Sequence, residues 1–184
     1  MKFKTFLALL AVLISCIFVT STFAMSYDHS LTVKDMEFHW KVEGSNLAVK
    51  AVAKTKGWVG VGFNPVKKMQ GANYILGFVR KGKLKIIDEY GNRTTSHTLD
   101  KKRGGKNSII SSSGSEEGGK TTIEFKIPLD SGDKADTVIN PGGNTVLLLA
   151  YGKRDSTRIG HEFYAIIQVN LNTGKFTVTR QVNK

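Results

Sequence analysis

Short apolar stretches with a period of two residues recur along the chain, and this pattern restricts it to a fold built from β-strands. Within residues 46–53, Leu47, Val49 and Ala51 fall on one side of an extended chain, and Lys50 falls on the other. Beyond residue 24, no segment keeps helical spacing over three turns. The sequence therefore predicts an all-β protein without a long helix.

Strand and turn signals extend this prediction over most of the chain. Polar turns at 80–82 and 172–174 each separate two strand-like runs, as in β-hairpins. Many short strands with regular turns are typical of an antiparallel β-sandwich or barrel. The expected strands are 36–42, 46–53, 58–63, 74–79, 83–90, 121–127, 145–151, 163–171 and 175–180, with a weaker one at 107–112.

The first 24 residues have the features of a secretory signal peptide. Lys2 and Lys4 precede an apolar run at 6–19, and Thr22 and Ala24 are small residues where a signal peptidase cleaves. We therefore expect residues 25–184 to form one exported domain, periplasmic or extracellular. A retained membrane anchor is the alternative, although the run is short for a span of about 20 residues.

Cys16, the only cysteine, lies within this leader. Cleavage after Ala24 would leave no cysteine for disulfides, iron–sulfur clusters or covalently attached haem. The sequence Leu-Ile-Ser-Cys at 13–16 also resembles a lipobox, so anchoring through a lipidated Cys16 is a second possibility.

The chain is strongly basic, with a net charge of +12, of which the leader contributes Lys2 and Lys4. A basic balance favours anionic partners. For an exported protein we expect a partner protein with an acidic surface, or an anionic membrane surface, and not nucleic acid. Solubility is the simpler explanation of the same charge.

Catalytic motifs are lacking in the sequence, so we do not expect an enzyme. It has no nucleophile elbow, no histidine pair with metal spacing and no phosphate-binding glycine loop. Asp130 and Asp133 flank Ser-Gly, which reads as a turn after a strand and lacks the oxygen ligands of a calcium loop.

Five side chains remain as candidates for chemistry. His29 is expected in solvent, His39 in a strand opposite its aromatic neighbours, and His97 in a polar loop. His161 follows a glycine and opens a strand, and Met69 lies in a loop between two strands. A thioether and an imidazole can together bind haem iron without cysteine, whereas methionine usually fills a core gap and a lone histidine is usually a surface residue.

An ordered set of segments resembles the DOMON family over about residues 31–171. It begins with Gly-Trp-Val-Gly-Val-Gly-Phe-Asn at 57–64 and Met-Gln-Gly-Ala-Asn-Tyr-Ile-Leu-Gly at 69–77. It continues with Asp-Glu-Tyr at 88–90, residues 118–125, Pro-Leu-Asp-Ser-Gly-Asp at 128–133, residues 149–152, and Asp155 followed by His161. Asn73 departs from the family pattern, which has aspartate there.

This resemblance implies an immunoglobulin-like β-sandwich and one of two kinds of site. Members similar to the cytochrome domain of cellobiose dehydrogenase bind haem b between a loop methionine and a later histidine, positions that match Met69 and His161. The implied function is electron transfer to or from a redox partner. The residues expected near the haem are then Trp58, Val61, Phe63, Ile75 and Phe163 as an apolar wall, and Lys67, Lys68, Lys153, Arg154 and Arg158 at the rim.

Other members of the family lack this pair of ligands and act as binding or interaction modules. The alternative function is therefore a non-redox module for a sugar or another small ligand, with Trp40, Trp58 and Tyr74 available for stacking. A structural adhesion domain with a basic face is a third possibility.

Overall fold

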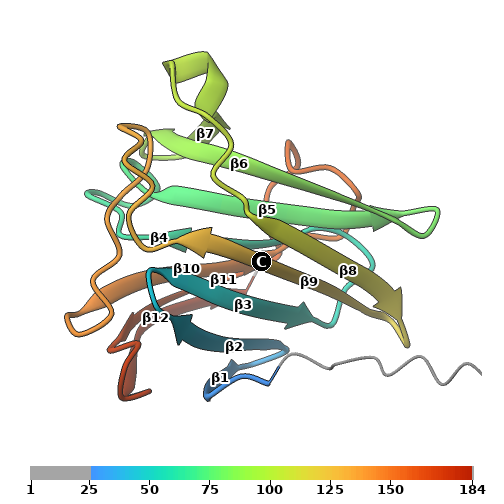
Figure 1. Cartoon of the computed structure of the whole chain (residues 1–184). Helices are drawn as coiled ribbons and strands as arrows, with labels where there is room; N and C mark the ends of the chain where they lie inside the picture. The colour runs from blue at the N-terminus through green and yellow to red at the C-terminus, as the bar shows by residue number, and fades with distance from the viewer. Residues whose placement is uncertain (1–25, 184) are drawn as a thin grey trace, which may run out of the picture.

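The computed structural model describes residues 26–183, which form two antiparallel β-sheets packed face to face (Figure 1). The predicted all-β sandwich is thereby confirmed. The predicted signal peptide and Cys16 lie outside the described residues.

The smaller sheet has five strands and occupies the front of Figure 1. Three consecutive strands pair as a meander, and a later hairpin adds the last two. Its strands, in spatial order, are β1 (His29–Val33), β2 (Met36–Glu43), β3 (Asn46–Ala53), β9 (Lys120–Pro128) and β8 (Ser111–Glu117).

The larger sheet has seven strands and carries the candidate site described below. Its centre is formed by β10, β4 and β5, which come from both halves of the chain. Its strands, in spatial order, are β12 (Phe176–Asn183), β11 (Phe163–Val169), β10 (Thr145–Tyr151), β4 (Val59–Phe63), β5 (Asn73–Arg80), β6 (Lys83–Arg93) and β7 (Ser96–Leu99).

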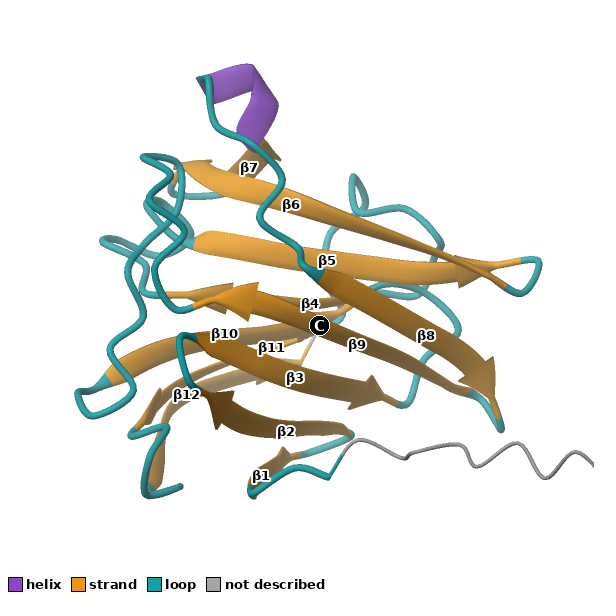
Figure 2. Ribbon diagram, in the orientation of Figure 1, coloured by secondary structure: helices purple, strands orange, loops and turns teal. Residues whose placement is uncertain are grey.

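The helical content is as small as the sequence predicts. Within residues 26–183 the helix is η1 (Asp100–Arg103), a 3-10 turn at the top of Figure 2. None of these residues belongs to a helix long and apolar enough to cross a membrane.

Alternating side chains of both sheets form the core between them. Phe38 and Trp40 of β2 are completely buried, and the Trp40 indole N–H donates to the Leu171 carbonyl at 2.8 Å. Leu47, Val49 and Ala51 of β3 belong to the same core, as their period of two predicts. His39 lies on the opposite side of β2 from the two aromatic residues, also as expected.

Three edge regions differ from the prediction. His29 is part of β1, where its ring lies 5.4 Å from that of Trp40 and is only half exposed. His97 belongs to β7 and not to a loop. The weak strand expected at 107–112 instead runs as β8, Ser111–Glu117. These strands are short or polar, and they form through pairing with a neighbour, which local sequence reports poorly.

Candidate ligand-binding face

The seven-stranded sheet has a second apolar surface, on the face turned away from the five-stranded sheet, which we call the outer face. Residues of β4, β5 and β10 that alternate with the core residues point there. They form a compact cluster separate from the main core, made of Trp58, Ala72, Tyr74, Leu76 and Phe78, with Met69, Leu148 and Ala150 packed against it.

Glycines allow the aromatic side chains of this cluster to lie close to the sheet. A Cβ on Gly62 would lie 2.5 Å from Cε1 of Tyr74, and one on Gly152 would collide with the indole of Trp58. Trp58 and Tyr74 are 5% and 6% exposed, and Trp40 is completely buried. These three aromatic residues therefore have no open ring face on which a sugar could stack.

Met69 lies at one end of the outer face, in the loop that joins β4 to β5. Its side chain is half-buried against the aromatic cluster. The backbone N–H of Met69 donates to the Thr94 carbonyl at 3.4 Å, and Gly91 leaves no space for a Cβ beside the Met69 carbonyl. The loop therefore rests closely on the end of β6.

His161 lies at the other end of the same face, just before β11. Its half-buried ring meets that of Tyr164 edge-on, with 4.9 Å between ring centres, and Tyr164 alternates with the core residues of β11. The five residues of β4 separate this end of the sheet from the Met69 loop by about 13 Å. The structure therefore places Met69 and His161 at opposite ends of one face.

The expected apolar wall is only partly on this face. Trp58 belongs to it, and its indole N–H donates to the Ile159 carbonyl at 3.0 Å. Phe63, also expected in this wall, is completely buried between the two sheets, on the side opposite Trp58. Alternation along the strands places three other expected wall residues in the core with it, namely Val61, Ile75 and Phe163.

The lysine and arginine side chains expected at the rim of the haem site are exposed. Lys153 pairs with Glu162, and Arg154 is exposed while its carbonyl accepts from the backbone N–H of Trp58 at 3.2 Å. Lys67 and Lys68 are exposed beside Met69. Arg158 differs, because its guanidinium reaches a buried acid.

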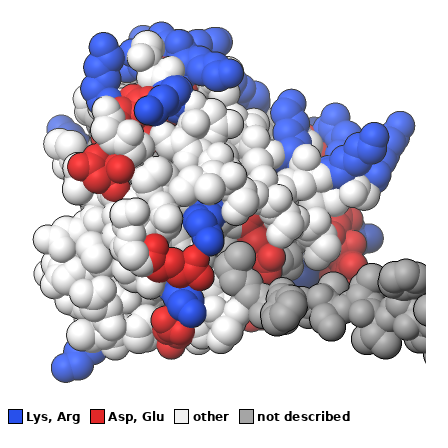
Figure 3. Space-filling model, in the orientation of Figure 1, with Lys and Arg blue, Asp and Glu red and all other residues white. Residues whose placement is uncertain are grey.

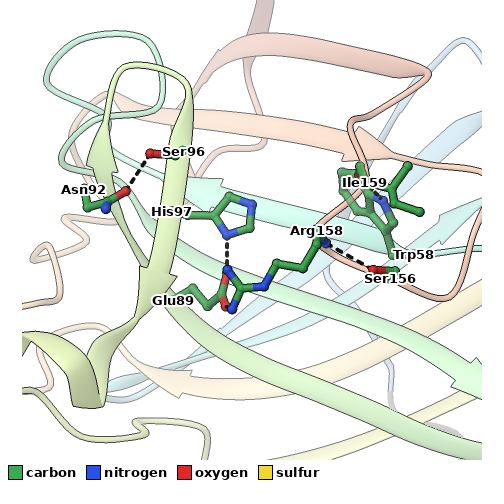
Figure 4. A network of polar contacts seen from close by, with 8 residues as sticks. All are labelled: Trp58, Glu89, Asn92, Ser96, His97, Ser156, Arg158 and Ile159. Carbon is green, nitrogen blue, oxygen red and sulfur yellow. Dashed lines mark hydrogen bonds and ion pairs between the residues drawn. The ribbon is translucent and has the colours of Figure 1, made fainter.

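That acid, Glu89, is the centre of a polar network that the sequence did not indicate. Glu89 is completely buried on β6; Nδ1 of His97 contacts one carboxylate oxygen, and Arg158 lies 3.7 Å from the other. Figure 4 shows His97 and Arg158 approaching Glu89 from two sides. The His97 ring also lies 5.6 Å from the ring of Tyr74. Pairing of β6 with β5 and β7 brings Glu89 to Tyr74 and His97, and Arg158 comes from the loop between β10 and β11, so no short motif reveals the network.

A cavity of about 420 Å³ adjoins this network. Its lining combines apolar side chains with two acids and three cations. The volume lies in the range of small-ligand sites, but Met69 and His161 are not among the lining residues, which are Phe78, Arg80, Lys85, Ile87, Glu89, Leu99 and residues 155–158.

We expect His97→Ala to destabilise the protein by about 2 kcal/mol, because it leaves the buried Glu89 carboxylate without its closest partner. Urea unfolding measures the change. His39→Ala is the matched control and should cost less than about 1 kcal/mol, since its partner Glu37 is 37% exposed. Equal losses in both variants would contradict the role given to Glu89.

On the face drawn in Figure 3, positive charge gathers in two groups. In Figure 3, lysine and arginine side chains gather at the top of the view, around η1, and at its right, near the turn between β5 and β6. Exposed members of these two groups are Lys101, Lys102 and Arg103, and Lys81, Lys83 and Lys85.

Comparison with known proteins yields one family and several relatives. The family model of the DOMON domain matches residues 32–152. A Drosophila melanogaster protein, MOXD1 homolog 2, is 24% identical over 137 residues, which are 70% of this chain and 17% of that protein. The chain thus spans only a small part of this relative.

Among solved structures, the cytochrome b domain of pyranose dehydrogenase from Coprinopsis cinerea has a TM-score of 0.51 at 11% identity, over 69% of this chain and 68% of that one. The cytochrome domain of Myriococcum thermophilum cellobiose dehydrogenase has a TM-score of 0.47 at 11% identity, over 80% of this chain and 70% of that one. At such identity the first likeness shows the fold alone.

Proposed function

Because the chain belongs to the DOMON family, we propose that it is an exported haem b-binding domain that carries electrons, with Met69 and His161 as the axial ligands. The observation that carries this proposal is their placement at opposite ends of one apolar face. Thioether and imidazole are the axial donors of many electron-transfer haems.

The residues between the two candidate ligands suit a flat apolar group. Leu148 and Ala150 of β10 are partly exposed. Beside them, the apolar side chains of the cluster cover Gly60 and Gly62 of β4. Met69 and His161 approach this strip from opposite strand ends. Lys153 and Arg154 follow β10 at the His161 end and are the candidates to neutralise propionates.

Haem would supply one-electron redox chemistry, and the protein would supply the rest. If Met69 and His161 both held the iron, they would leave no site on it open to substrate, so we propose a carrier and not an enzyme. The apolar strip would exclude water. The basic groups shown in Figure 3 favour a redox partner with an acidic surface, with an anionic membrane surface as the second choice.

The cavity beside Glu89 favours a second candidate function, a binding module for a small non-redox ligand. It lies on the same face but is lined by neither candidate iron ligand. Its lining combines apolar side chains with charges of both signs, because Arg80 pairs with Asp155 and Arg158 with Glu89, so it would suit a small ligand with both apolar and polar groups.

Titration of the purified chain with haem separates the two functions. We expect one equivalent to bind and to give a low-spin spectrum with a sharp α-band on reduction, because both axial donors are strong-field groups. Free haem in the same buffer is the control. A chain that binds no haem, or binds it without an α-band, would leave the binding module as the better assignment.

A further inference from the structure

Three carboxylates from distant parts of the chain meet beside the middle of β6. They are Asp88 of β6, Asp100 at the start of η1, and Asp136 in the loop between β9 and β10. One oxygen of each lies within 4.8 Å of the others. Asp88 is 5% exposed and Asp100 only 1% exposed.

Hydrogen bonds orient two of these carboxylates and leave their other oxygens unused. The Ser108 backbone N–H donates to Oδ2 of Asp88 at 2.7 Å. The hydroxyls of Ser108 and Ser131 donate to Oδ2 of Asp136 at 2.7 and 2.5 Å. Oδ1 of Asp88, Oδ1 of Asp136 and both oxygens of Asp100 are buried and accept no hydrogen bond.

The positive charge that such a group needs is not supplied by the described part of the chain. Among residues 26–183, no lysine, arginine or histidine forms an ion pair with any of the three. Buried carboxylates without a partner are costly. They must therefore either bind protons or share a cation, and Asp100 and Asp136 are close enough to share a proton.

We propose that Asp88, Asp100 and Asp136 bind one calcium ion. The available ligands are all carboxylate oxygens, which hard cations prefer, and neither cysteine nor histidine is present to favour zinc. Separations of at most 4.8 Å allow the three oxygens to reach one ion. Calcium tolerates flexible oxygen coordination, whereas magnesium demands near-ideal octahedral geometry and gives up its waters reluctantly, so a buried group of protein oxygens favours calcium.

The ion would connect three segments, which are β6, η1 and the loop between β9 and β10. It would fix η1 and the loop between β9 and β10 onto the inner side of β6, where Asp88 lies opposite Ile75. Met69 and His161 lie on the outer face of the same sheet. Calcium binding is therefore independent of haem, and either proposal can fail without the other.

The test uses haem-free chain stripped with EDTA and desalted at pH 7.5. Isothermal titration with CaCl₂ should show one site, and the melting temperature should rise by about 5 to 10 °C at a calcium concentration one hundred times the dissociation constant. MgCl₂ should give a much smaller shift. An equal shift with magnesium, or no binding of calcium, would overturn the proposal.

Asp100→Asn keeps the side-chain size, removes one charge, and should abolish both the binding and the thermal shift. Asp136→Asn, at a less buried position, gives the same test should Asp100→Asn fold poorly. The control is Asp130→Asn, an exposed turn residue whose Oδ1 accepts the Gly132 N–H, and it should keep the full response. A calcium shift retained in both cluster variants would place the ion elsewhere and refute the site.

Discussion

His161→Ala should remove most haem binding, with an affinity loss of more than about 100-fold, because imidazole nitrogen is the stronger of the two proposed axial donors. The haem that remains should be high-spin. Met69→Leu preserves the apolar contact with the outer-face cluster but removes the thioether sulfur. This variant should keep haem and show a lower reduction potential, since thioether ligation raises the potential. Optical spectra and a redox titration measure both effects.

Other histidines provide the controls for this experiment. His29 and His39 lie on the five-stranded sheet, away from the outer face, so His29→Ala and His39→Ala should leave the haem spectrum unchanged. His97 lies beside Tyr74, and its replacement should alter stability but not iron ligation. Unaltered spectra in both His161→Ala and Met69→Leu would show that other residues hold the iron.

Strand positions could be predicted because alternation and turns are local. The ranges 46–53 and 145–151 were predicted at their observed bounds. Strand β7 was missed, since Ser-His-Thr-Leu carries no alternation and forms through its pairing with β6. Such a strand is defined by its neighbour and not by its own residues.

The candidate site was harder to predict, because a sandwich sheet has two faces and the sequence does not say which face a ligand uses. Trp58 and Phe63 belong to one apolar run, yet they lie on opposite faces of the sheet. The Glu89 network and the three aspartates were invisible for another reason. Their members are far apart in the chain, and only strand pairing and loop packing bring them together.

The same three aspartates should make the metal-free protein less stable as pH rises from about 5 to 8. Burial raises the pKa of Asp88 to about 7, although the hydrogen bond from the Ser108 backbone N–H lowers it by a smaller amount. Burial, with the nearby charges of Asp88, Asp136 and Asp133, raises the pKa of Asp100 to about 8. Both values lie well above the usual value of about 3.9 in an unfolded chain.

Between the pKa of the unfolded chain and the pKa values of the folded protein, the folded protein holds protons that the unfolded chain has released. The free energy of unfolding is therefore highest near pH 5 and falls as the pH rises through the folded pKa values. We expect a loss of about 3 kcal/mol across this pH range, less than the sum for two independent groups because the carboxyls interact. Urea unfolding in EDTA at pH 5, 6, 7 and 8 measures it. Asp100→Asn should flatten the profile and Asp130→Asn should not. A wild-type profile that rises with pH would mean that the buried carboxyls are ionised without cost, a result incompatible with the packing around Asp88 and Asp100.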